Sequence, residues 1–374
     1  MFNVDTVSEY QLEITSYCNA ACPQCPRNIN GGSVNPHMPL VHLPRSIIDA
    51  TFTQEICKDV HQIFFCGAYG DPIMHPEFLN ILQDFRRKNP TIWLYMHTNG
   101  GVHDNKYWHE IATIMNGYGH IAFGIDGLED TLHLYRRNVN YHKVISNAQA
   151  FIDAGGKAQW NFIVFKHNEH QVEQAREISS AMGFTDILVR RTGRFYNQVT
   201  MEELDKWPVQ DRTGNIEYYL ELPTQTEYRN KSMLFLPNLK KQYARTKDYF
   251  DTTEIKCDAL LGKKVLINAE GMVLPCTFLN HKYDARYHTM DQLPGVNPLA
   301  MRDGVSTIDH FLDQFGVDNL NIRYHTLKEI FENNMWSALI DSFDKTLDNG
   351  RLFECANTCG SKLTKVWDQG GSTR

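Results

Sequence analysis

Apolar residues in the first half of the chain recur with two periods. Short runs rich in β-branched and aromatic residues are typical of buried strands and occur at residues 10–15, 63–67, 92–97, 120–126, 159–165 and 187–190. Between these runs the apolar spacing is helical, as across residues 172–182, where we expect Asn168 to be the N-cap and Gly183 to end the helix. The alternation predicts an α/β fold with a parallel sheet and helices outside it. Six units fit a partial (β/α)6, TIM-like barrel better than a closed barrel of eight.

The pattern changes after residue 195. Residues 196–256 are polar and interrupted by proline, which predicts a bridging segment with little regular structure. Residues 264–269 and 272–275 then read as a β-hairpin, and residues 326–343 read as one helix. We therefore expect a partial-barrel domain at residues 1–195, a bridging segment at 196–256 and a smaller α+β domain at 257–374.

Charge and hydropathy narrow the classes of function. Acidic residues outnumber basic ones, 44 to 37, which gives a formal net charge of −7 and disfavours a broad surface for nucleic acid. No apolar run reaches the roughly 18 residues that a membrane span requires, and the first residues, MFNVD, lack the pattern of a secretory signal. We therefore expect a soluble, cytoplasmic protein with no membrane partner.

The chain has nine cysteines, an odd number, and this favours metal ligation or catalysis over a disulfide framework. Cys18, Cys22 and Cys25 lie in the run CNAACPQC, directly after the first predicted strand. Three thiolates this close on an irregular loop can bind three irons of one cubane cluster, and two prolines in and after the run discourage regular structure. A zinc site is the alternative, with His37 as the nearest further ligand.

This C-x3-C-x2-C run resembles the signature of the radical S-adenosylmethionine (SAM) superfamily. The resemblance extends over residues 10–195 and implies a 4Fe–4S cluster held by the three cysteines, with its fourth iron bound by SAM. In that family an electron from the cluster cleaves SAM, and the resulting 5′-deoxyadenosyl radical abstracts hydrogen from a substrate. The resemblance thus implies an enzyme whose protein part positions the cofactor and excludes water.

Further matches to the family lie at the ends of predicted strands. Residues 66–72, CGAYGDP, resemble its Gly-Gly-Glu-Pro element, residues 97–100, HTNG, resemble the element at the next strand end, and residues 124–127, GIDG, resemble Ser-x-Asp-Gly. Asp71, Gly124 and Gln24 depart from the family, which commonly has Glu, Ser and an aromatic residue there. The resemblance implies SAM contacts from Gly67, Tyr69, Gly70, Asp71, Thr98, Asn99, Asp126, Arg136, Arg137 and Asn161.

Ordinary structural roles are the alternative for several of these residues. Gly-Asp-Pro is common turn chemistry on its own. Arg136 or Arg137 matches an arginine that pairs with the SAM carboxylate, but either one can equally be a solvated arginine on a helix face. Asn161 is equally explained as a hydrogen-bonded core residue.

Four cysteines in the last third of the chain form a second group. Cys257, Cys276, Cys355 and Cys359 resemble the ligands of the SPASM or Twitch extension that follows radical SAM cores. Their number implies the shorter Twitch type, with one auxiliary 4Fe–4S cluster. Tetrahedral zinc is the alternative, because four cysteines suit it equally well by count.

The remaining candidates are two cysteines and a group of arginines. Cys57 lies in a helical pattern and is expected to be a small buried residue. Cys66 ends a predicted strand beside the SAM motif, where it is either a hydrogen-atom donor to a substrate radical or a packing residue. Arg190, Arg191 and Arg194 follow the sixth strand, where they either bind a substrate carboxylate or phosphate or form a solvated rim.

The resemblance implies oxidoreductase-like radical chemistry on a small molecule or a peptide, with net oxidation through the auxiliary cluster and a reducing partner such as flavodoxin or ferredoxin. The chain enters its first strand almost at once, which favours a small molecule or a peptide delivered by a partner. The alternatives are a peptide maturase or epimerase of the same superfamily and, in a different class, a non-catalytic metal–sulfur scaffold or redox sensor. A scaffold would not require the strand-end motifs around Asp71 and Asn99.

Overall fold

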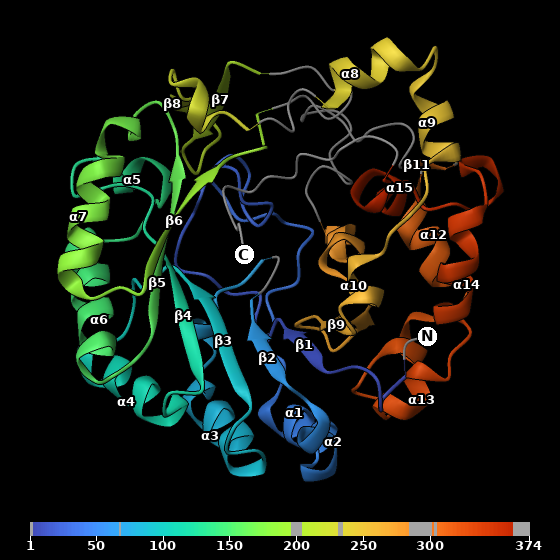
Figure 1. The fold of residues 1–374 in the computed structure, drawn as a ribbon, viewed down its shortest axis with the longest axis horizontal. Helices are drawn as coiled ribbons and strands as arrows, with labels where there is room; N and C mark the ends of the chain where they lie inside the picture. The colour runs from blue at the N-terminus through green and yellow to red at the C-terminus, as the bar shows by residue number, and fades with distance from the viewer. Residues whose placement is uncertain are drawn as a thin grey trace.

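The computed structural model describes residues 3–66, 69–195, 204–230, 235–283, 301–302 and 305–361. One eight-stranded sheet runs through it in the order β10-β9-β1-β2-β3-β4-β5-β6 (Figure 1). Its strands are β1 (Glu9–Leu12), β2 (Gln62–Phe65), β3 (Trp93–Thr98), β4 (Gly119–Gly124), β5 (Ala158–Val164), β6 (Asp186–Arg191), β9 (Lys264–Ile267) and β10 (Val273–Leu274).

All neighbouring pairs in this sheet are parallel except β9 with β10. The two edge strands, β10 and β6, do not pair with each other, so the described part of the sheet is open. The six strands predicted from the first half of the chain are confirmed, and so is the α/β class with a partial barrel.

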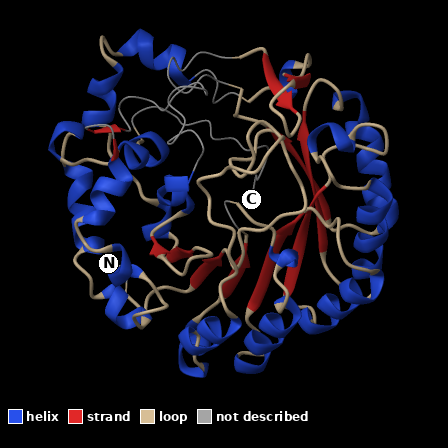
Figure 2. Ribbon diagram, turned by 180° about the vertical axis from the view of Figure 1, so that it is seen from behind, coloured by secondary structure: helices blue, strands red, loops and turns tan. Residues whose placement is uncertain are grey.

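Helices cover one face of the sheet, which we call the outer face (Figures 1 and 2). They are α1 (Arg45–Thr51), α2 (Gln54–Asp59), α3 (Phe78–Lys88), α4 (Asn105–Met115), α5 (Leu132–Tyr135), α6 (Tyr141–Asp153) and α7 (Val172–Met182). Burial alternates along β1, β2 and β3, as expected for strands with one packed face. Phe65, for example, is buried against Phe78 and Phe85 of α3, whereas Phe64 lies on the inner face and is half-buried.

The two ends of α7 test two capping predictions. Gly183 ends the helix in the left-handed region, at φ +86°, as predicted. The predicted N-cap is wrong, because Asn168 begins a short 3-10 turn, η2 (Glu169–Gln171), before α7. Its side chain accepts a hydrogen bond from the backbone N–H of Phe165 at 2.7 Å and donates one to the backbone oxygen of Asp126 at 2.9 Å. Asn168 therefore ties two strand ends together rather than capping the helix.

The predicted bridging segment contains more structure than its composition indicates. It forms a hairpin of β7 (Lys206–Gln210) and β8 (Ile216–Glu221), then η3 (Thr226–Tyr228), α8 (Phe235–Gln242) and α9 (Thr246–Thr252). Pro208 lies within β7, which is an edge strand of a two-stranded sheet and so tolerates the missing N–H. Val209 and Leu220 are buried and anchor the hairpin.

The predicted hairpin after residue 264 is confirmed as β9 and β10, and β9 also pairs with β1 along residues 9–12. The main sheet thus continues across the predicted boundary at residue 257. The elements around and after the hairpin are α10 (Asp258–Leu261), η5 (Thr277–Tyr283), β11 (Met301–Arg302), β12 (Val305–Ser306), α12 (Thr307–Asp313), η7 (Val317–Leu320), α13 (Leu327–Phe331), α14 (Met335–Asp341), η8 (Ser342–Asp344), η9 (Leu347–Asn349) and α15 (Phe353–Cys359).

The prediction of one helix over residues 326–343 is wrong. The chain forms α13 and α14 with a break between them, because the side-chain oxygen of Asn333 accepts the backbone N–H of Met335 at 2.8 Å. Such a local bond competes with the helical pattern. A capping box between Thr326 and Glu329 fixes the start of α13.

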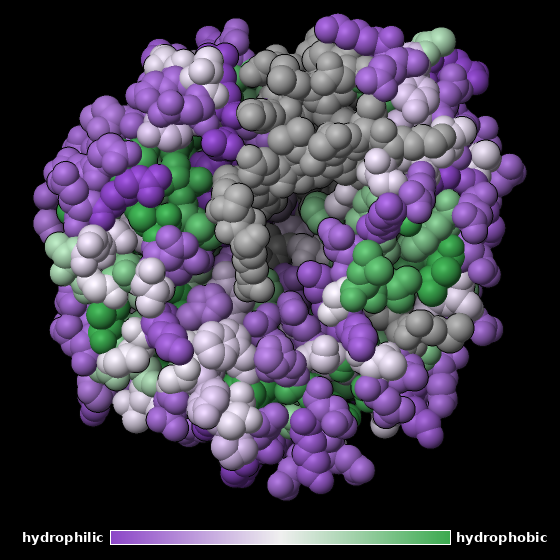
Figure 3. All heavy atoms as spheres, viewed as in Figure 1, coloured by the Kyte–Doolittle hydropathy of each residue, from purple (hydrophilic) through white to green (hydrophobic). Residues whose placement is uncertain are grey.

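Polar side chains dominate the face of the molecule in Figure 3, and apolar side chains show there in smaller groups. Within the described ranges, no helix is long and apolar enough to cross a membrane.

Candidate functional site

Cys18, Cys22 and Cys25 lie on the loop that leaves the C-terminal end of β1. The amide Nδ2 of Asn99 donates to the sulfur of Cys18 at 3.7 Å, and Nη1 of Arg136 donates to the sulfur of Cys22 at 3.8 Å. N–H donors directed at sulfur stabilise thiolates and tune iron–sulfur clusters. The donor set and its surroundings therefore fit an iron–sulfur cluster.

Burial shapes the electrostatics of this loop. It raises the pKa of Cys22 to about 11, against the lowering effect of Arg136, and it raises the pKa of Cys18 further. Among the residues that the structure describes, no three Cys, His, Asp or Glu side chains converge tightly enough for a single metal ion.

Asp71 joins two of the predicted strand-end motifs. Its Oδ2 accepts hydrogen bonds from the Thr98 hydroxyl at 3.1 Å, from the Asn99 backbone N–H at 2.8 Å and from Asn99 Nδ2 at 2.7 Å. Its Oδ1 accepts the backbone N–H of Ile73 at 3.3 Å. Burial raises the pKa of Asp71 to about 6 despite these bonds. The carboxyl group thus holds the end of β3 in place and, through Asn99, reaches Cys18.

The side chains of the adjacent residues Arg136 and Arg137 have different partners. Nε of Arg136 donates to Oδ2 of the fully buried Asp126 at 2.6 Å, which directs the guanidinium toward Cys22. Arg137 forms an ion pair with Glu217 of β8 at 2.5 Å. The guanidinium of Arg136 also occupies the space that a side chain at Gly124 would need, so a serine there would require Arg136 to move.

The loop of residues 66–72 is held by a carboxylate that the sequence prediction missed. Oε1 of Glu13, just after β1, accepts the backbone N–H groups of Tyr69 at 2.7 Å and of Gly70 at 3.1 Å. Burial raises the pKa of Glu13 to about 7. The only signal in the sequence is a charged residue inside an apolar run. Gly67, another predicted SAM contact, lies outside the described residues.

The inner face of the sheet brings together Cys66, Tyr95, His97, Asn161 and Arg190. The sulfur of Cys66 lies 3.7 Å from Nδ1 of His97, and the Tyr95 hydroxyl is hydrogen-bonded to Nε2 of the same ring. Nε of Arg190 donates to Oδ1 of Asn161 at 3.2 Å. Burial lowers the pKa of His97 to about 3, so its imidazole is neutral at pH 7, and raises the pKa of Cys66 to about 12.

The other predicted substrate arginines have different partners. Arg191 donates to the backbone oxygen of Glu227 at 2.6 Å, and Arg194 donates to the backbone oxygen of Gln24. The hydroxyl of Thr192 donates to Oε1 of Gln24 at 3.1 Å. Of the three arginines, only Arg190 lies with Cys66, His97 and Asn161 on the inner face.

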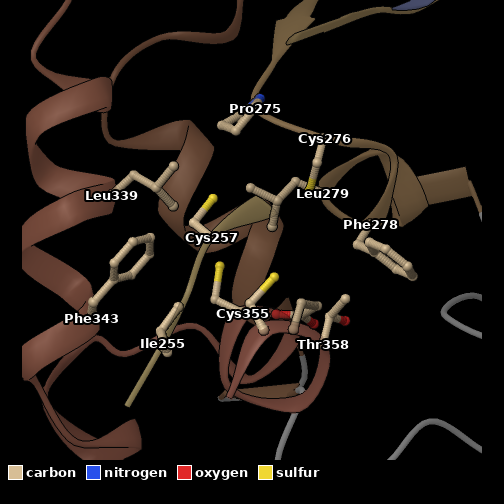
Figure 4. Close-up of a pocket in the computed structure, with 12 residues that line it drawn as sticks. Ile255, Cys257, Pro275, Cys276, Phe278, Leu279, Leu339, Phe343, Cys355 and Thr358 are labelled. Carbon is tan, nitrogen blue, oxygen red and sulfur yellow. The ribbon is translucent and has the colours of Figure 1, made fainter. Parts of the chain in front are cut away.

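The second group of cysteines lines an apolar cavity (Figure 4). Cys257 precedes α10, Cys276 follows β10, and Cys355 and Cys359 lie on α15. Burial raises the pKa of Cys276 to about 12 and that of Cys355 well above its ordinary value. The four thiols line the same cavity, where four thiolates can hold either a 4Fe–4S cluster or one zinc ion.

Residues 12–177 match the family model of the radical SAM superfamily, and this range includes the cysteine loop, Asp71, Asn99 and Arg136. The chain contains a radical SAM domain. The sequence matches none of the curated proteins.

Solved structures resemble this chain along most of its length. Native anSMEcpe with bound AdoMet aligns with a TM-score of 0.51 and 14% identity, over 94% of this chain and 89% of that one. Streptococcus suis SuiB bound to S-adenosylmethionine gives a TM-score of 0.47 and 14% identity over 73% of this chain. The alignment spans 60% of the SuiB chain. At this identity the likeness to anSMEcpe establishes the fold.

Proposed function

We propose that this protein cleaves SAM reductively and abstracts a hydrogen atom from a small-molecule or peptide substrate at the inner face of its sheet. The observation that carries the proposal is the cysteine loop, whose sulfurs accept hydrogen bonds from Asn99 and Arg136 at the C-terminal edge of that sheet. When bound, the cluster and SAM together supply a 5′-deoxyadenosyl radical. The residues of the chain position these cofactors and the substrate.

The proposed cofactor residues act in two ways. Cys18, Cys22 and Cys25 bind iron, and Arg136, rather than Arg137, pairs with the carboxylate of SAM, because it is the arginine directed toward Cys22. The remaining proposed SAM residues form or support the strand-end loops that would contact it: Gly67, Tyr69, Gly70, Asp71, Thr98, Asn99, Asp126 and Asn161.

The groups on the inner face suit a substrate with an anionic group. Arg190 provides a cation there, and Cys66 provides a thiol that we propose as a hydrogen-atom donor. If Cys66 gives a hydrogen atom to a substrate radical, the remaining sulfur radical takes one electron from the reducing partner, for which flavodoxin or ferredoxin is suitable, and one proton from water. His97, which is neutral and hydrogen-bonded to the thiol, can pass that proton.

The auxiliary site offers the other fate of the substrate radical: we further propose that Cys257, Cys276, Cys355 and Cys359 hold an auxiliary 4Fe–4S cluster that accepts an electron from a substrate radical that Cys66 does not quench, so that this substrate undergoes net two-electron oxidation. This assigns residues 1–195 to the radical SAM core, 196–256 to the bridging segment and 257–374 to the auxiliary-cluster domain. A structural zinc ion is the alternative occupant of that site.

Anaerobic reconstitution with iron and sulfide, followed by SAM and dithionite, tests the proposal. We expect about two 4Fe–4S clusters per chain and release of 5′-deoxyadenosine. A protein that binds iron and sulfide but releases no 5′-deoxyadenosine would instead be a scaffold or redox sensor. Deuterium transfer from candidate substrates into 5′-deoxyadenosine would then identify the substrate class.

A further inference from the structure

The segment that follows Cys276 is hydrogen-bonded to the loop of residues 66–71. The hydroxyl of Thr277 donates to Oε1 of Gln11 on β1 at 3.0 Å, and Nε2 of the same glutamine donates to the backbone oxygen of Cys66 at 2.9 Å. A single side chain thus links the residue next to Cys276 to the residue that begins the loop.

A second connection runs through Glu13 and Asn280. Nδ2 of Asn280 donates to Oε2 of Glu13 at 3.3 Å, while Oε1 of Glu13 accepts the backbone N–H groups of Tyr69 and Gly70. The Tyr69 hydroxyl returns to the same segment and donates to the backbone oxygen of Asn280 at 2.9 Å. Nδ2 of Asn268, in the turn of the β9–β10 hairpin, donates to Oδ1 of Asn280 at 2.9 Å.

The connection through Glu13 and Asn280 is buried, so it is costly to break. Glu13 is 2% exposed and Asn280 is 1% exposed. A buried polar group that loses its hydrogen-bond partner destabilises the folded state, because its desolvation is no longer compensated. A network of such bonds therefore favours one geometry. Cys276 is tied to the same segment, because its backbone oxygen accepts the N–H of Leu279 at 3.2 Å. The positions of Cys276 and of the Tyr69–Gly70 backbone therefore depend on each other.

We propose that Glu13 and Asn280 are positioning residues that couple the C-terminal cysteine site to the SAM-binding loop. Metal bound by Cys276 and its partners fixes the segment 276–280, which holds the backbone of residues 69–70 in the geometry that binds SAM. SAM affinity is then higher when the second site is filled, and by linkage SAM binding stabilises the second site. This inference rests on the proposed function.

A reciprocal exchange of side chains tests the coupling. In Glu13→Gln the new NH2 group replaces one carboxylate oxygen, so it faces another donor, either Asn280 Nδ2 or the N–H groups of the loop. In Asn280→Asp the donor Nδ2 is replaced by an oxygen, so two carboxyl groups face each other. Each single variant should weaken SAM binding by about tenfold, as expected for loss of one buried bond. The double variant Glu13→Gln/Asn280→Asp restores a donor–acceptor pair with the roles reversed and should bind SAM within about twofold of wild type.

Two measurements separate positioning from general destabilisation. SAM affinity is measured by titration on protein with an intact first cluster. Amide hydrogen exchange at residues 69–70 is measured without SAM and should be faster in both single variants and slow again in the double variant. Asp84→Asn is the matched control, because Asp84 is buried between α1 and α3, where it binds Arg45 and Arg87, away from this network. It should lower the melting temperature without changing SAM affinity.

The variant Cys276→Ala tests the coupling between the C-terminal cysteine site and the SAM-binding loop. This variant should accelerate exchange at residues 69–70 in the wild-type background but add little in the Asn280→Asp background. Single variants that bind SAM as tightly as wild type, or a double variant that fails to recover, would overturn the proposal. If wild-type protein bound no SAM at all, the proposed function would fail instead, while hydrogen exchange would still report whether Cys276 and the loop are coupled.

Discussion

Arg136 and Arg137 are adjacent in the sequence, yet their surroundings differ completely. Arg136 follows α5, a single helical turn, and its side chain bridges Asp126 and the sulfur of Cys22. Arg137 reaches the β7–β8 hairpin, where it pairs with Glu217 and lies against the ring of Tyr218. The family pattern alone did not distinguish them, because the direction of each side chain depends on where the short helix ends.

This difference gives a matched pair of variants. Arg136→Ala should weaken SAM binding by about 10- to 100-fold, because a charge-assisted hydrogen bond is worth roughly 1.5–3 kcal/mol. Arg137→Ala removes a partly exposed ion pair and should leave SAM affinity within about twofold of wild type. Titration of SAM into reconstituted protein measures both. Equal losses in the two variants would refute the assignment of Arg136.

The three cysteines of the first loop should be individually essential. Cys18→Ala, Cys22→Ala or Cys25→Ala each leaves two thiolates, too few to retain a cluster that has only three protein ligands. We expect iron and sulfide to fall by about one cluster per chain and 5′-deoxyadenosine formation to disappear. A variant that still cleaved SAM at the wild-type rate would show that these cysteines do not hold the SAM-binding cluster.

The two isolated cysteines offer a further comparison. Cys66 is half-buried beside His97 on the inner face, whereas Cys57 is fully buried in α2. If Cys66 is a hydrogen-atom donor, Cys66→Ala should still release 5′-deoxyadenosine but lose or alter the product. Cys57→Ala should change only stability, by about 1 kcal/mol. Chromatography of products from both variants decides, and an unchanged product from Cys66→Ala would leave this thiol with a packing role.

At the scale of elements, the strands and their ends were predictable. Apolar runs located β1 to β6, and motifs at three strand ends named Asp71, Asn99 and Asp126, which the structure places around the cysteine loop. Glu13 was not predictable in this way. Its partners Tyr69, Gly70 and Asn280 are far away in the sequence. Without knowledge of those partners, a charged residue in a predicted strand is expected to face solvent.

The failed element predictions have local causes. The side chain of Asn333 accepts a hydrogen bond from the backbone of Met335 between the two helices. The spacing of apolar residues does not predict such a break. The β7–β8 hairpin was missed because Pro208 and its polar neighbours resemble a loop, although Val209 and Leu220 bury one face. In both cases short-range chemistry or tertiary packing overrides the average pattern.

The close approach of the 66–72 loop to β1 predicts an effect at Gly70. A side chain there would collide with the backbone oxygen of Thr15, so Gly70→Ala must displace the loop, at an expected cost on the order of 1–3 kcal/mol. Gly117→Ala is the control, because Gly117 also resists substitution, with φ +77° and a cost of about 1–2 kcal/mol, but a side chain there meets nothing within 4 Å.

Both glycine variants should lower the free energy of unfolding in urea, but only Gly70→Ala should weaken SAM binding, by tenfold or more, as expected for loss of at least one loop contact. If the two variants lost stability and SAM affinity in parallel, the loop at Gly70 would have no specific part in binding. If neither lost affinity, SAM would bind elsewhere.

At the scale of the whole molecule, the sheet joins parts of the chain that the sequence separates. β9 lies beside β1 in parallel register, so the segment that carries Cys257 and Cys276 is built onto the first strand of the radical SAM domain. Buried bonds through Asn280 reinforce this junction. The two groups of cysteines are therefore attached to the same strand, one at its C-terminal end and one through its neighbour.

The second site can act as an electron acceptor or can stabilise the fold, and a double variant distinguishes these two roles. Cys276→Ala/Cys355→Ala should keep the first cluster and, at saturating SAM, still release 5′-deoxyadenosine, but it should form no oxidised product because its electron acceptor is missing. Iron and sulfide counts with EPR spectra on the soluble variant establish which cluster remains. If the variant instead aggregates, Cys355→Ser, a smaller change, is assayed in its place. Wild-type protein with one cluster per chain and zinc at the second site would refute the electron-acceptor role and leave the chemistry of the first site intact.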